Sequence, residues 1–114
     1  MPETGTTLEV RRVDDRSAII AVRGELTGAT EAALMDAYGR AADPSTRLVV
    51  LDFGELDYMN STGLALIVQL LARGRAERCE VHAFGLSDHY REIFQITRLA
   101  DFVTLHGDRA AALA

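Results

Sequence analysis

The feature that most constrains the fold is the uninterrupted aliphatic run Leu48-Val49-Val50-Leu51. A strand with one face in solvent alternates apolar and polar residues, whereas a strand covered on both faces does not need to. We therefore predict that residues 47–53 form a central strand, buried on both faces. Such strands are typical of parallel sheets that are flanked by helices.

The rest of the chain supplies the other elements of an α/β domain. Apolar alternation predicts strands at residues 8–13, 17–23, 80–84 and 101–105 in addition to 47–53. Helical spacing, caps and composition predict helices that begin near residues 31, 62, 88 and 107. The order β-β-α-β-α-β-α-β-(α) predicts a single domain over residues 1–114, with a mixed, mostly parallel sheet of four to five strands. We expect residues 1–6 to be flexible and residues 107–114 to form a terminal helix.

The helix expected from residue 62 is apolar on more than one side. Its predicted core face follows helical spacing and consists of Leu64, Ile67, Val68 and Leu71. Leu66 and Leu70 lie off that face, and Gly74 is expected to end the helix. Either the fold buries the whole helix or part of it contacts another protein, and burial is the more common outcome for an internal helix of an α/β domain.

Charge and composition exclude several function classes. The net charge of -5 and the pI of about 5.1 argue against binding to nucleic-acid phosphates. All 12 basic residues are arginine, so P-loop and Schiff-base chemistry, which need a lysine, are excluded. The same absence argues against a phosphoacceptor receiver domain, although Asp52 stands at the end of the aliphatic run 48–51.

The sequence predicts a cytoplasmic protein. No apolar run approaches the roughly 20 residues that span a bilayer, and the N-terminus is polar rather than a signal sequence. Cys79 is the only cysteine, so no internal disulfide can form.

No catalytic or metal-binding pattern stands out. The histidines at positions 82, 89 and 106 are not tied to any serine by a recognisable signature, and the Gly-x-Ser-x-Gly elbow is absent. Paired cysteines, a two-histidine helix motif and a calcium loop are also absent. We therefore expect neither an enzyme nor a cofactor or metal.

The most informative segment for function is Asp57-Tyr58-Met59-Asn60-Ser61-Thr62-Gly63-Leu64. It lies where a loop enters a helix, at the sheet edge where the loops 24–29, 54–61 and 85–88 should meet. One of Asn60, Ser61 or Thr62 is expected to cap the helix. A phosphate on Ser61 would lie beside unpaired N–H groups at the positive end of the helix dipole, so Ser61 is a candidate switch.

Three segments resemble the STAS domains of small anti-sigma factor antagonists. Gly24-Glu25-Leu26 is similar to the family's Gly-Glu-Leu-Asp segment. Residues 58–64 are similar to its phosphorylation loop, and residues 86–102 to its third helix and the strand after it. The likeness covers residues 11–105.

The resemblance implies a partner-switching mechanism. The unmodified protein would bind an anti-sigma factor, a serine kinase of the histidine-kinase-like ATPase fold, and thereby free a sigma factor. The kinase would phosphorylate Ser61, with Thr62 as the second choice, and a PP2C-type phosphatase would reverse this. The partner would contact the sheet edge, whose implied residues are Glu25, Thr27, Tyr58, Asn60, Ser61, Thr62, Gly63 and Leu66.

Two residues depart from the family pattern, because Asn60 and Thr27 stand where the family has acids. Asn60 could instead cap the second helix, and Thr27 could begin the first. An alternative function is a STAS interaction module that is never phosphorylated and acts in a signalling or transport complex. A small-ligand or nucleotide sensor is a third possibility, although the chain has no glycine-rich phosphate loop.

Overall fold

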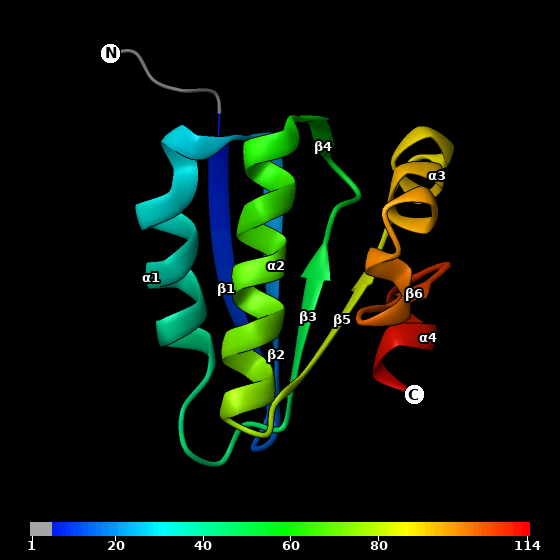
Figure 1. Cartoon of the computed structure of the whole chain (residues 1–114). Helices are drawn as coiled ribbons and strands as arrows, with labels where there is room; N and C mark the ends of the chain where they lie inside the picture. The colour runs from blue at the N-terminus through cyan, green and yellow to red at the C-terminus, as the bar shows by residue number, and fades with distance from the viewer. Residues whose placement is uncertain (1–5) are drawn as a thin grey trace.

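The computed structural model describes residues 6–114 as one mixed sheet with helices on both faces (Figure 1). The strands are β1 (Thr6–Asp14), β2 (Ser17–Leu26), β3 (Leu48–Asp52), β4 (Leu56–Met59), β5 (Glu80–Phe84) and β6 (Thr104–His106). The helices are α1 (Glu31–Ala41), α2 (Ser61–Ala76), α3 (Asp88–Ile96) and α4 (Arg109–Leu113), with 3₁₀ turns η1 (Gly28–Thr30) and η2 (Leu99–Asp101). The predicted α/β class and element order are confirmed, with one additional strand.

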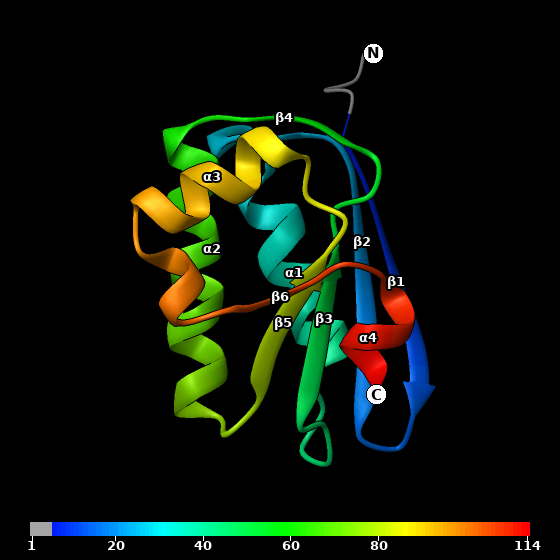
Figure 2. The ribbon, with the colours of Figure 1, turned by 90° about the vertical axis from the view of Figure 1, so that its right-hand side faces the viewer.

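The sheet order is β1-β2-β3-β5-β6, and β4 also pairs with β2. Only β1 and β2 are antiparallel, and every other pair is parallel. Helices α1 and α2 lie side by side against one face (Figure 1), where the main apolar core forms. Helix α4 lies on the other face (Figure 2). Its Ala112 packs with Ile19 and Val50.

The central strand is confirmed. β3 lies between β2 and β5, and Val49, Val50 and Leu51 are completely buried. Val49 and Leu51 belong to the core under α1 and α2, whereas Val50 belongs to the smaller cluster under α4. Burial on both faces explains why this strand carries no polar alternation.

The prediction of four to five strands was one too few, because the segment 54–59 is not simply a loop. β3 and β4 pair one after the other with the same neighbour, β2. Residues 17–21 of β2 pair with β3, and residues 24–26 pair with β4. β4 is short, and its exposed residues Asp57 and Tyr58 are adjacent rather than alternating. The sequence therefore lacks the period of two that would reveal it.

The predicted core face of α2 was partly wrong. The buried residues are Gly63, Leu66, Ile67, Leu70 and Gly74, whereas Val68 is 49% exposed. The helix also continues past Gly74 to Ala76. A Cβ at Gly74 would lie 2.7 Å from the carbonyl oxygen of Cys79, so glycine is needed there for close packing and not as a helix end.

The elements at the two ends of the chain differ from the prediction in their bounds. Thr6 already belongs to β1, and the rest of the segment expected to be flexible, residues 1–5, lies outside the described residues. The last strand is Thr104–His106 rather than residues 101–105, because η2 occupies the first part of that segment. The terminal helix is confirmed as Arg109–Leu113, shorter than residues 107–114.

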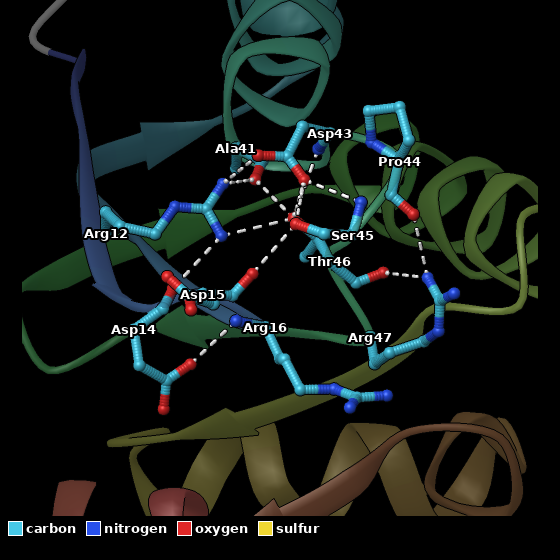
Figure 3. A network of polar contacts seen from close by, with 10 residues as sticks. All are labelled: Arg12, Asp14, Asp15, Arg16, Ala41, Asp43, Pro44, Ser45, Thr46 and Arg47. Carbon is cyan, nitrogen blue, oxygen red and sulfur yellow. Dashed lines mark hydrogen bonds and ion pairs between the residues drawn. The ribbon is translucent and has the colours of Figure 1, made fainter.

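A polar network joins β1 to the loop between α1 and β3, at the end of the sheet opposite the α2 N-terminus (Figure 3). The Arg12 guanidinium donates to the carbonyl oxygen of Ala41 at 2.7 Å and pairs with the Asp43 carboxylate at 3.2 Å. Asp43 also accepts hydrogen bonds from the Ser45 hydroxyl and the Ser45 N–H. The two Ser45 bonds contribute most to a lowering of the Asp43 pKa from 3.8 to about 2, and a hydrogen bond from the Thr46 hydroxyl contributes next.

We expect Asp43→Asn to destabilise the protein in a pH-dependent way. A carboxylate whose pKa is lower in the folded state stabilises that state above its unfolded pKa, and this contribution disappears as the pH falls through the folded value. The difference in unfolding free energy between wild type and variant should therefore be largest above pH 4 and shrink toward pH 2. Urea titrations at several pH values measure it. Asp36→Asn, which removes only an exposed ion pair with Arg40, should give a smaller difference; an equal difference would contradict the role given to Asp43.

Candidate functional site

The three loops that were predicted to meet do lie together, at the end of the sheet that holds the α2 N-terminus. The N–H of Gly24 donates to the carbonyl oxygen of Glu55 at 3.0 Å, which joins the first loop to the second. The second loop contacts the third at Gly85, where an added Cβ would lie 2.6 Å from the Gly54 nitrogen. Gly85 has a φ of +88°, which favours glycine.

Asn60 is the cap of α2, which settles the choice among Asn60, Ser61 and Thr62. Its side-chain oxygen accepts a hydrogen bond from the N–H of Gly63 at 2.8 Å, and its carbonyl accepts from the N–H of Leu64 at 3.0 Å. Asn60 has the extended backbone expected at this position. The structural role of a polar side chain at this helix end is therefore filled without Ser61.

Ser61 is the first residue of α2, and its side chain is exposed. Within residues 6–114, neither its hydroxyl nor the N–H groups of Ser61 and Thr62 have a hydrogen-bond partner. The first N–H groups of a helix have no partner inside the helix and attract negative charge. The site therefore combines an accessible hydroxyl with two N–H groups that could bind an added phosphate.

Thr62 is also exposed, but its methyl group lies against η1. A Cβ at Gly28 would be 2.9 Å from Cγ2 of Thr62. Thr62 thus has a packing role that Ser61 lacks.

Most of the residues implied as partner contacts lie on this edge. Glu25 and Tyr58 are neighbours across the β2–β4 pair, and both are exposed. Thr27 is half-buried and caps η1, since its hydroxyl accepts from the N–H of Ala29. Gly63 is buried, and Leu66 is only 2% exposed and packs in the core. The edge therefore does not include the Leu66 side chain.

Tyr90 contacts the loop before α2, and the sequence did not predict this contact. Tyr90 is buried in α3, and its hydroxyl accepts a hydrogen bond from the N–H of Met59 at 2.9 Å. This bond fixes the backbone one residue before the cap. A tyrosine in a predominantly apolar helical face was the available signal, because a buried tyrosine hydroxyl usually has a partner.

We expect Tyr90→Phe to lower the free energy of unfolding by about 1–3 kcal/mol, because it leaves the buried Met59 N–H without an acceptor. Tyr58→Phe removes the same atom from a side chain that is 48% exposed, and should change stability by less than about 0.5 kcal/mol. Urea unfolding of the two variants compares them. Similar losses would show that the Tyr90 bond does not stabilise the loop.

The edge around Ser61 carries exposed acids, including Glu25, Glu55 and Asp57. Glu55 is paired with Arg23 at 3.5 Å. In residues 6–114 no group of three or more histidine, cysteine or acidic side chains is placed to hold a metal ion. The described helices also include none that is both long and apolar enough to cross a bilayer.

Comparison with known protein families decides the relationship. The family described as "Mlab, STAS domain" matches residues 9–105. The chain belongs to the STAS domain family. The resemblance found in the sequence is therefore confirmed, and the three loops described above form one edge of a STAS domain.

Individual relatives agree with this assignment. This STAS domain is 30% identical over 100 residues to a putative anti-sigma factor antagonist, BtrV, of Bordetella bronchiseptica, covering 88% of this chain and 86% of BtrV. It is 29% identical over 99 residues to the anti-sigma-B factor antagonist of Listeria monocytogenes, covering 87% of each chain. A crystal structure of an anti-sigma factor antagonist from Mycobacterium paratuberculosis has the same fold, with a TM-score of 0.81 and 22% identity over 95% of this chain and 91% of that one.

Proposed function

We propose that this STAS domain is an anti-sigma factor antagonist that is controlled by phosphorylation of Ser61. In the unmodified state it binds an anti-sigma factor that is also a serine kinase of the histidine-kinase-like ATPase fold. Binding releases the sigma factor, and phosphorylation of Ser61 ends the complex. The protein acts in the cytoplasm as a regulator rather than a catalyst, and a PP2C-type phosphatase restores the binding form.

The observation that carries this proposal is that different residues at the start of α2 provide the helix cap and the exposed hydroxyl. Asn60 caps the helix, while the neighbouring Ser61 hydroxyl is exposed and makes no hydrogen bond within residues 6–114. A kinase can reach such a hydroxyl without unfolding the domain. The names of the relatives support the general role, because both are described as anti-sigma factor antagonists.

Electrostatics explain why a phosphate would release a partner. A phosphoserine adds about -1.5 to -2 charges to an edge that already carries Glu25 and Asp57. Docking would then bury an anion near like charges, which costs several kcal/mol at an interface. The N–H groups of Ser61 and Thr62 can stabilise the phosphate on the free domain, so modification would favour dissociation over unfolding.

The departures from the family pattern have local explanations. Asn60 and Thr27, which stand in place of acids, each cap a helix with a side-chain oxygen. Capping does not require a charge, so these substitutions preserve the fold of the edge. They reduce its negative charge, and the partner surface that fits it should be correspondingly less basic.

The direct test is to incubate the purified domain with its cognate anti-sigma factor and ATP, and then to map the modification by peptide mass spectrometry. We expect one phosphate, on Ser61, and loss of the complex as it accumulates. Modification of Thr62 instead would move the switch by one residue. Stable binding without any phosphate would contradict the proposed mechanism.

That last result would favour the alternative, a STAS interaction module that is never phosphorylated and works in a signalling or transport complex. The observation that favours it is the absence of the family acid before Ser61, where Asn60 is engaged as a cap. Such a module would use the same edge, and its binding would be insensitive to a negative charge at position 61.

A further inference from the structure

A cavity of about 700 Å³ lies well away from Ser61, between the C-terminal half of α2, the edge of β5 and the segment from η2 to β6. Small-molecule sites in proteins typically have volumes of about 300–1,000 Å³. The lining residue of α2 nearest to Ser61 is Val68, about 10 Å farther along the helix at 1.5 Å per residue. The cavity therefore forms a region separate from the proposed phosphorylation edge.

The topology explains why this space is open. β6 pairs with β5 only from His82 to Phe84, so the first part of β5 has no neighbouring strand on that side. Buried residues Cys79, Val81 and Leu99 line the cavity. Val68 and Phe102 also line it, and they are 49% and 66% exposed. An apolar molecule in the cavity would therefore cover side chains that the domain itself leaves in water.

The charged groups around the cavity indicate the polarity of an occupant. Arg98 pairs with Asp101 at 2.8 Å, and Glu80 contacts the His82 ring at 2.9 Å. Arg75 also lines the cavity, and among residues 6–114 its guanidinium has no hydrogen-bond or ion-pair partner. The acids thus already have partners, and the unpaired group is a cation that can bind a carboxylate or sulfonate.

We propose that this cavity binds a small amphipathic anion, with an aromatic or aliphatic body and one carboxylate or sulfonate group. The body lies on Val68, Leu99 and Phe102, and the anionic group pairs with Arg75. This site is independent of the proposed function, because its residues are not those of the phosphorylation edge.

The probe for the test is 1-anilinonaphthalene-8-sulfonate, whose fluorescence rises in apolar sites. Its neutral analogue, N-phenyl-1-naphthylamine, has the same aromatic body without the sulfonate. We expect saturable binding of the sulfonate at one site of the folded protein, and about tenfold weaker binding of the neutral analogue, since one charge-assisted contact is lost. Amide shifts in NMR spectra should cluster around Val68, Leu99 and Phe102.

Matched variants test the position. Ala72→Phe fills the cavity from an exposed site on α2 and should weaken binding at least about tenfold. Ala65→Phe adds the same ring to an exposed position of the same helix that does not line the cavity, and should leave affinity unchanged. Arg75→Gln should weaken the sulfonate and not the neutral analogue, whereas Arg40→Gln on α1 should affect neither. Circular dichroism confirms that each variant is folded.

Several results would overturn the proposal. They are an absence of saturable binding, equal effects of the two phenylalanine variants, and equal affinity for the charged and neutral probes. Sedimentation velocity tests another occupant: a dimer that Ala72→Phe abolishes would assign this face to a second copy of the chain. Ser61→Asp should not change probe affinity, so failure here is distinguishable from failure of the phosphorylation mechanism.

Discussion

Ser61→Asp is expected to weaken binding to the cognate anti-sigma factor by at least about 100-fold, which corresponds to about 2.7 kcal/mol. The added carboxylate stands at the exposed start of α2, on the same edge of the domain as the exposed acids Glu25 and Asp57. A negative charge there opposes docking for the same reasons as a phosphate. Calorimetry or surface plasmon resonance with the purified partner measures the loss.

Ser61→Ala is the matched control, and it should bind nearly as well as the wild type. Neither variant should be destabilised by more than about 0.5 kcal/mol, because Asn60 caps the helix and the Ser61 hydroxyl has no partner within residues 6–114. The aspartate variant should even gain slightly from the helix dipole. Unchanged affinity in Ser61→Asp would exclude a charge switch at this position. Loss of stability in both variants would mean that the hydroxyl is structural after all.

Gly63→Ala is expected to have the largest effect on stability, a loss of about 3 kcal/mol, which is the upper range for overpacking in a core. An added Cβ would lie 2.1 Å from the carbonyl oxygen of Leu26 and 2.8 Å from its carbonyl carbon. Both atoms belong to the backbone of β2, which is held by β4 and cannot rotate away. Alanine would gain about 1 kcal/mol of helix propensity, but the clash outweighs this gain.

The same change should disturb the edge around Ser61, because the N-terminus of α2 must move away from β2. Partner binding should therefore fall together with the unfolding free energy measured in urea. Gly107→Ala is the control, since an added Cβ there meets nothing within 4 Å, and its stability should stay within about 0.5 kcal/mol of wild type. A stable Gly63→Ala variant would show that α2 can move away from β2 at little cost.

The sequence was sufficient to predict elements whose burial leaves a direct pattern in the chain. β3 is buried on both faces, and a four-residue aliphatic run indicates this directly. The core face of α2 was harder to predict, because leucines on two sides of a helix satisfy helical spacing in two ways. Its true orientation depends on Gly63 and Gly74, which approach β2 and the turn before β5 closely. Such contacts between distant segments leave no periodic signal.

The candidate site was predictable in outline because it is contiguous in sequence. Asn60 and Ser61 were both recognised as candidates at a helix start, and their different roles required the hydrogen-bond geometry. The strand β4 and the bond from Met59 to Tyr90 join residues that are far apart along the chain. Neither follows from local pattern, since each depends on how the loop folds back onto β2 and α3.

The Asn60 cap also affects how long each form of the protein would survive in a cell. Protein abundance responds to stability changes of about 1–2 kcal/mol through quality-control proteolysis. Because the helix end is secured by Asn60, the proposed phosphorylation of Ser61 should not destabilise the domain, and the modified form should be degraded no faster than the unmodified one. A fall in the proportion of the modified form would then report the balance of kinase and phosphatase rather than faster degradation of that form.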